Sequence, residues 1–208
     1  MPPLIPPLST TIAKLRQLPL TIWMFIALAF MFVNASAFVP QGEMERFRSV
    51  MTIYMIMLLL FLPYAKKAVG YQLNLNKAIA YLAGGFVITV FVMTAFRAVI
   101  PALAGQTYVV GAPIYFLVLH IFVVAFSEEM IFRGALSTLI TPIPAAVAFG
   151  VFHVSAYGGS ISSIFVAIVA GLVFFVIMKK TNIWAAIGVH AGWNSVMLGI
   201  FAMMGVGA

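Results

Sequence analysis

The chain alternates long apolar stretches with short polar connections, and this pattern predicts a membrane protein built from helices. An apolar stretch of about 18 residues or more is long enough to cross the hydrocarbon core of a bilayer. We therefore expect an all-α, polytopic bundle of about seven transmembrane helices. The predicted segments are residues 20–39, 50–65, 78–100, 113–132, 144–157, 161–178 and 183–204.

The fifth segment, residues 144–157, is short, and its crossing decides which loops share a side. It begins after a proline entry and ends at a glycine turn. At about 1.5 Å per residue it barely spans a core of about 30 Å, so a re-entrant helix is the alternative. If all seven segments cross, one side holds eight of the 11 basic residues. These are Lys14, Arg16, Lys66, Lys67, Lys77, Arg133, Lys179 and Lys180.

This charge asymmetry favours a full crossing, with the N-terminus in the cytoplasm and the C-terminus outside. Without it, the basic residues would divide six against five. We expect one membrane-embedded unit, with three helices in residues 1–112 and a four-helix core in residues 113–208. A cleaved signal peptide is disfavoured, because the apolar run at residues 20–39 is too long for one.

The composition agrees with a multi-pass protein of a cell membrane and excludes several other classes. The chain is 64% hydrophobic and only 7% charged, which a soluble domain could not reconcile with a polar surface. Disulfides, thiolate metal sites and a cysteine nucleophile are excluded, because the 208 residues contain no cysteine. The net charge of +7 is spread near the ends of apolar runs, so we expect membrane lipid and no nucleic acid as a partner.

Ionisable side chains within the predicted membrane segments are few, and each is expensive to insert. Glu128 and Glu129 are two of only four acidic residues, and they lie next to each other in the sequence SEEMIFRGAL. Measured from the predicted cytoplasmic ends, Glu128 lies about 8 Å deep, His153 about 15 Å and His190 about 12 Å. Three helices thus bring polar groups to a similar level, which predicts one shared, water-accessible cavity.

Helical spacing assigns different surroundings to the two carboxylates. Glu129 and Arg133 are four residues apart and can form an ion pair on one helix face. Glu128 is turned about 100° away, so it lacks a local partner and is the candidate general base. His190 and Asn194 share a face of the last helix, where their N–H groups suit an oxyanion hole. His120 is expected to be a packing residue.

The order of these motifs resembles the CPBP family of intramembrane proteases, which includes type II CAAX prenyl endopeptidases and Abi proteins. The motifs are Glu128-Glu129-x-x-x-Arg133, Phe149-x-x-x-His153 and His190-x-x-x-Asn194, within about the last 95 residues. The resemblance implies that Glu128 activates a water, with His153 helping to hold it. It implies that His190 and Asn194 stabilise the oxyanion, with Glu129, Arg133 and Phe149 in supporting roles.

Other readings stay open. Glu128, His153 and His190 are ligand types for zinc, but no HExxH motif is present, so a glutamate-type peptidase without a cofactor is preferred. The expected substrate is a peptide or lipidated protein, possible CAAX-type processing included, in a prokaryotic membrane. The alternative is a non-enzymatic bacteriocin self-immunity factor or small carrier that uses the buried acids for binding. The absence of a repeat counts against a carrier.

Overall fold

A computed structural model of the chain describes residues 75–95, 120–154 and 161–203, with the single positions Thr52, Met55, Ile56, Leu59 and Val118. Every regular element in these residues is helical, and none of them forms a strand, which agrees with the expected all-α class. The predicted segment 20–39 and most of 50–65 lie outside the described residues. The total of seven helices therefore stays a prediction.

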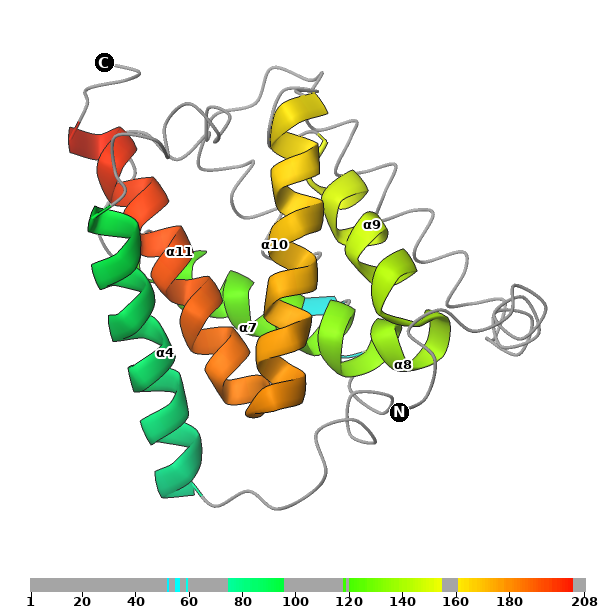
Figure 1. Cartoon of the computed structure of the whole chain (residues 1–208), viewed down its shortest axis with the longest axis horizontal. Coiled ribbons are helices and arrows are strands. Elements are labelled where there is room, and N and C mark those ends of the chain that lie inside the picture. The colour runs from blue at the N-terminus through cyan, green and yellow to red at the C-terminus, as the bar shows by residue number, and fades with distance from the viewer. Residues whose placement is uncertain are drawn as a thin grey trace.

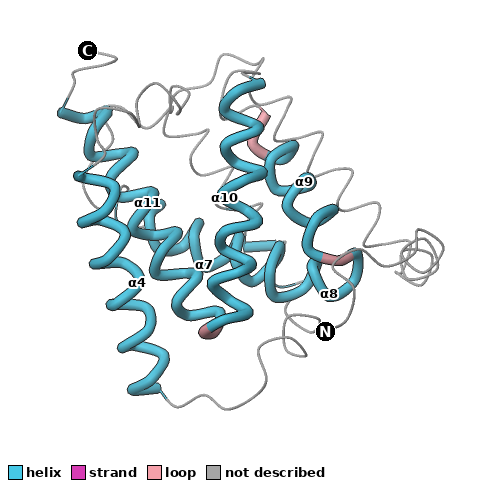
Figure 2. Tube along the Cα trace, viewed as in Figure 1, coloured by secondary structure: helices cyan, strands magenta, loops and turns pink. Residues whose placement is uncertain are grey.

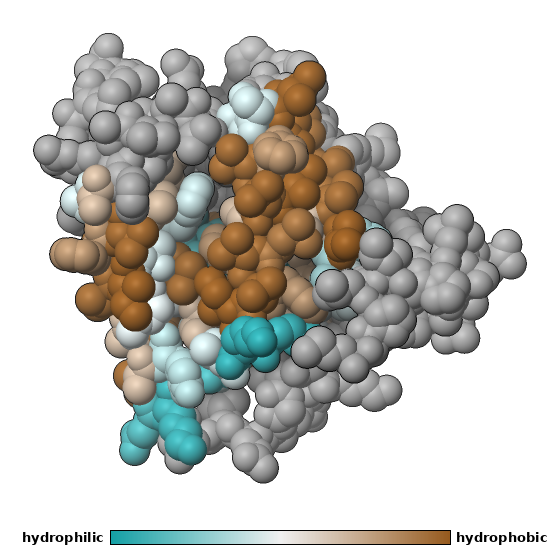
Figure 3. All heavy atoms as spheres, in the orientation of Figure 1, coloured by the Kyte–Doolittle hydropathy of each residue, from teal (hydrophilic) through white to brown (hydrophobic). Residues whose placement is uncertain are grey.

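Two described helices, α4 (Leu75–Ala95) and α10 (Ile161–Lys180), are long and apolar enough to cross a membrane. Large apolar side chains remain exposed along one stripe of α10, at Ile161, Phe165, Val169, Val173 and Val176. Figure 3 shows the same apolar surface continuing over the neighbouring helices. A stripe of this kind is suited to contact with lipid chains rather than water.

The predicted fourth segment is helical from His120 and continues to Ile140, well beyond the expected end at residue 132. It consists of η1 (His120–Val124), α7 (Ala125–Glu128), η2 (Glu129–Leu136) and α8 (Ser137–Ile140), and the η elements have the wider turns of a π-helix. Turns of this kind are rare and often occur at functional sites. Figure 1 shows α7 between α11 and α10, and α8 on the other side of α10, below α9.

This course corrects the expectation for Arg133. The sequence suggested a loop charge at the cytoplasmic end of the segment, but Arg133 lies inside η2 and is buried. The ion pair with Glu129 makes a charge tolerable inside the protein at that position. The depth of Glu128 was counted from a helix end at Arg133, and this end is wrong because the helical run continues to Ile140.

The fifth segment forms α9 (Pro142–Phe152), with a proline in its first turn, and His153 follows directly. At about 1.5 Å per residue this helix is only about 16 Å long, shorter than a hydrocarbon core. Thr141 precedes it with φ of 78°, a left-handed conformation that is unusual for a β-branched residue. A strained link thus joins α8 to α9 and turns the chain sharply.

The last helix, α11 (Ile183–Met203), lies against α4 and follows a tight turn after α10 (Figure 2). Gly188 and Gly192 lie one turn apart on α11, and Gly85 faces them from α4. A Cβ atom at Gly188 would overlap the carbonyl oxygen of Leu82, and one at Gly192 would lie 2.8 Å from that of Phe86. These small residues allow close contact of the two helix backbones, as is common between membrane helices.

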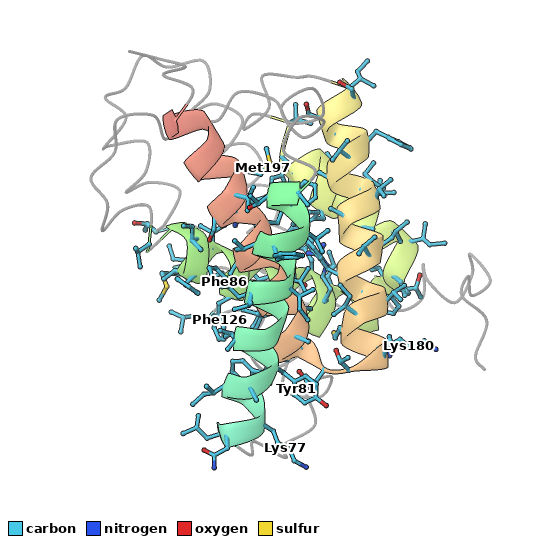
Figure 4. All side chains as sticks on the ribbon, turned by 60° about the vertical axis from the view of Figure 1, so that its left-hand side comes forward. Lys77, Tyr81, Phe86, Phe126, Lys180 and Met197 are labelled. Atoms are coloured by element: carbon cyan, nitrogen blue, oxygen red, sulfur yellow. The ribbon has the colours of Figure 1, made fainter. Side chains whose placement is uncertain are left out.

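Three lysines of the described helices lie toward one end. Lys77 lies near the start of α4, and Lys179 and Lys180 end α10. Figure 4 shows Lys77 and Lys180 toward the same end, and Figure 3 shows hydrophilic surface there. Their positions agree with the predicted topology, which places all three lysines on one side of the membrane.

Candidate active site

Glu128 lies at the centre of a cluster formed by three separate elements. Its side chain is 1% exposed. Its Oε1 lies 3.4 Å from Nε2 of His153, and its Oε2 lies 3.4 Å from Nε2 of His190. The structure therefore brings together a carboxylate of α7, the histidine that ends α9 and a histidine of α11.

Glu129 holds two further groups through one carboxylate oxygen. Its Oε1 lies 3.1 Å from Nη1 of Arg133, which is the ion pair expected from the spacing. The same oxygen lies 2.8 Å from Nδ1 of His190, a contact that the sequence did not reveal. Because Glu129 is 0% exposed, both contacts offset the cost of burying its charge. Glu129 thus couples its own helix to α11.

Hydrogen bonds to oxygen define which nitrogen of each histidine carries a hydrogen. Nδ1 of His153 lies 2.7 Å from the carbonyl oxygen of Phe149, which only accepts, so Nδ1 donates. Nδ1 of His190 donates to Glu129, whose ion pair with Arg133 favours the carboxylate form. Because Nδ1 of each histidine is used in these hydrogen bonds, Nε2 is the nitrogen that faces Glu128. Each Nε2 atom can share a proton with that carboxylate.

Phe149 packs against three members of the cluster. Its ring centroid lies 4.4 Å from that of His153 and 5.9 Å from that of His190, and the Arg133 guanidinium lies 4.1 Å from it. Such contacts fix the rings and also stabilise a buried cation. The supporting position that the motif gave to Phe149 is thus a central one in the structure.

Two residues of α10 contact the cluster, and the sequence motifs did not include them. The Phe174 ring is stacked on His190 with centroids 4.8 Å apart, and the carbonyl oxygen of Gly171 accepts a hydrogen bond from Nε of Arg133 at 3.4 Å. Both residues lie in an apolar run where phenylalanine and glycine are ordinary. A glycine within a helix is the sole sequence signal, because it often marks close packing.

The remaining predicted residues, Asn194 and His120, have no described contact with the Glu128 cluster. Asn194 lies one turn beyond His190 on α11 and is partly exposed, and its amide has no recorded hydrogen bond within the described part of the chain. His120 begins η1, but its side chain lies outside the described residues. The catalytic roles of Glu128, His153, His190 and Asn194 stay predictions.

Among the described residues, no group of three or more His, Cys, Asp or Glu side chains is arranged to hold a metal ion. Nε2 of both histidines faces a carboxylate oxygen. The preference for a peptidase without zinc stays a prediction, and no step below involves a metal.

Comparison with known proteins gives a match over the second half of the chain. Residues 110–196 match the model of a family described as type II CAAX prenyl endopeptidase, Rce1-like. Searches of curated proteins and of solved structures found no match. The matched residues include the whole cluster, and the match indicates a membrane-integral protease. The resemblance drawn from the three motifs is thereby confirmed, and residues 110–196 are similar to Rce1-like type II CAAX prenyl endopeptidases.

Proposed function

We propose that the protein is an intramembrane endopeptidase of the CAAX-processing type, in which Glu128 activates the attacking water. One observation carries the proposal: a buried carboxylate has each of its oxygens 3.4 Å from the Nε2 atom of a different histidine. Such a group can accept a proton and pass it on, as general acid–base catalysis requires. The family match over the same residues supports the reaction class.

The chemistry that follows is hydrolysis of a peptide bond. Glu128 takes a proton from water while the water oxygen forms a bond to the carbonyl carbon of the substrate. The tetrahedral intermediate then collapses, the C–N bond breaks, and the proton passes from Glu128 to the leaving amine. His153 is suited to holding the water, because its side chain is 14% exposed and is the most accessible of the cluster.

His190 and Asn194 are assigned to the developing oxyanion. His190 presents Nε2 toward Glu128, and Asn194 lies one turn away on the same helix. When Nε2 of His190 carries a proton, it can donate to a carbonyl oxygen that gains charge. The partly exposed amide of Asn194 is the second donor in this proposal.

The proposed substrate is a lipidated peptide or protein with a C-terminal CAAX-type sequence. The family description supports this class. The exposed apolar side chains of α9 and α10 are compatible with a lipid chain close to the site, which includes Phe149 and His153 of the same segment. Recognition of a prenyl group is part of the proposal and rests on the family description.

The decisive experiment is cleavage of a farnesylated CAAX peptide by the purified protein in detergent, followed by mass spectrometry. Glu128→Gln keeps the size of the side chain but removes the base. We expect a loss of kcat of about 100-fold or more, since general acid–base catalysis contributes about 10²–10⁴-fold. The matched control is Glu43→Gln, an acid outside the motifs, which should cleave as the wild type does.

The outcomes separate the function from the mechanism. Cleavage by the wild type and by Glu128→Gln alike would contradict the role of Glu128 as the base. Cleavage of an unprenylated peptide at the same rate would contradict prenyl recognition and leave the protease assignment. If the folded wild type cleaves no peptide, prenylated or not, the reading as a membrane protein that only binds a partner gains support.

A further inference from the structure

His190 has contacts at the edge of its ring and a separate contact on its face. Glu129 contacts its Nδ1 and Glu128 faces its Nε2, both at the edge of the ring. The ring is joined to its helix through Cγ, and it can turn about the Cβ–Cγ bond when either contact loosens. A contact on the face of the ring resists this rotation.

Phe174 of α10 makes that contact. Its ring lies nearly parallel to the imidazole of His190, with centroids 4.8 Å apart and planes inclined by 23°. Phe149 meets His190 from a different direction, with ring planes at 83° and centroids 5.9 Å apart. Phe174 is 3% exposed, so its side chain is confined by the surrounding helices. A flat, confined ring on its face limits how far the imidazole can rotate about Cβ–Cγ.

The same turn of α10 also positions the group that orients Glu129. The carbonyl oxygen of Gly171 accepts from Nε of Arg133 at 3.4 Å, and the Arg133 guanidinium lies 5.2 Å from the Phe174 ring centroid. A Cβ atom at Gly171 would lie 3.1 Å from Nη2 of Arg133, so glycine leaves room for the guanidinium. One turn of an otherwise apolar helix thus contacts both sides of the Glu129–His190 hydrogen bond.

We infer that Phe174 is a positioning residue, which holds the plane of His190 so that Nε2 stays directed at Glu128. The catalytic consequence rests on the proposed function, whereas the structural one does not. The motifs of the sequence did not include α10 in the site. Here α10 contributes through shape and stacking and not through an ionisable group.

The structural arm uses imidazole ¹⁵N NMR of the whole protein in detergent. The chain has only three histidines, so the His190 signal can be assigned by its loss in His190→Gln. In the wild type we expect His190 to carry its hydrogen on Nδ1. Phe174→Leu removes the flat ring. In this variant we expect the two ¹⁵N chemical shifts of His190 to move toward each other, as they do when the hydrogen exchanges between Nδ1 and Nε2. Phe174→Met fills the space with a flexible chain and serves if the leucine variant does not fold.

The matched control is Phe175→Leu. Phe175 is the next residue on α10, and its ring lies 5.5 Å from Nζ of Lys179, away from the cluster. The Phe175→Leu variant also loses a phenyl ring, but one that lies away from the cluster. The His190 signals should therefore stay unchanged. In the catalytic arm, Phe174→Leu should lower kcat on the farnesylated peptide by about 10-fold or more with KM within about twofold, because a misplaced catalytic group costs rate and not binding.

Each result decides the inference. A moved His190 signal in Phe174→Leu or Phe174→Met, with an unchanged signal in Phe175→Leu, supports it. An unchanged His190 signal in both folded Phe174 variants overturns it, and so does an equal change in Phe175→Leu. If the signal moves as expected but the wild type cleaves no peptide, the positioning role stands and the proposed function fails.

Discussion

Glu129 shows how a second carboxylate becomes tolerable beside Glu128. One of its oxygens contacts both the Arg133 guanidinium and Nδ1 of His190, and its side chain is buried. A charge in such a place is stable only while its partners remain. Glu129 therefore stabilises the fold and fixes the tautomer of His190, and Glu128 remains directed toward the two Nε2 atoms.

Replacing Glu129 by glutamine is expected to destabilise the protein and to release His190. The change leaves the Arg133 guanidinium buried without its ion pair, and breaking such a pair costs about 3–5 kcal/mol. Thermal unfolding in detergent, followed by tryptophan fluorescence, should show a lower midpoint. The double change Glu129→Gln/Arg133→Met should lose less stability than Glu129→Gln alone, because no unpaired charge remains. An equal or larger loss in the double variant would argue against the ion pair as the cause.

At this scale, the sequence predicted contacts within one helix better than contacts between helices. The four-residue spacing of Glu129 and Arg133 was sufficient to predict their ion pair. The contact of Glu129 with His190 joins residues 61 positions apart, so no local pattern reports it. Phe174 was invisible for another reason, because its role is stacking and its neighbours are apolar as well.

Close contact between α4 and α11 positions His190 from outside the site. Gly188 and Gly192 flank His190 on α11, and the backbone of α4 fills the space that side chains would occupy there. Toward the other end of the contact, Met93 of α4 packs with Val196 and Met197. The third predicted segment therefore has a structural role, which its sequence alone did not indicate.

Enlarging Gly188 should force these helices apart and move His190. In Gly188→Ala the new Cβ would overlap the carbonyl oxygen of Leu82, so we expect a loss of stability of about 1–3 kcal/mol, as for an overpacked core. Gly84→Ala is the matched control, because nothing lies within 4 Å of its added Cβ. Thermal unfolding should show a lower midpoint for Gly188→Ala and an unchanged or higher one for Gly84→Ala. Equal midpoints for the two variants would contradict this packing.

The predicted helix boundaries agree with the observed ones where an apolar run ends in a polar turn. The predicted segments 161–178 and 183–204 agree with α10 and α11 within two residues, because Lys179–Asn182 form a clear break. The fourth segment was misjudged, because Arg133 looked like a boundary and lies inside η2. A buried ion pair hides the end of a membrane helix from any estimate based on charge alone.

The described helices combine exposed apolar side chains with three lysines at one end. The lysines near the start of α4 and at the end of α10 lie toward the same end, as the positive-inside rule requires for a common side. The start of α10, with exposed Ile161, lies one helix length away from these lysines. The described helices therefore have two distinguishable ends, and labelling can measure on which side of the membrane each end lies.

Cysteine labelling should place the lysine end in the cytoplasm. The chain contains no cysteine, so single substitutions report one position each. In cells, Lys77→Cys and Lys180→Cys should react with a membrane-impermeant maleimide only after permeabilisation. Ile161→Cys is the matched position at the other end of α10, and it should differ from Lys180→Cys in accessibility. The reverse pattern would contradict the cytoplasmic assignment, and different behaviour of the two lysine positions would contradict their common side.

Because the site joins residues from α7, η2 and α11 that lie far apart in the sequence, it has a consequence for biogenesis. Glu128 and Glu129 are synthesised before His190, which follows Glu129 by 61 positions, and Arg133 is the partner that accompanies them in the same helix. In the folded chain, His190 of α11 lies against both carboxylates. Nascent chains that stall before residue 190 would expose an incompletely paired acidic helix to the quality-control machinery of the membrane.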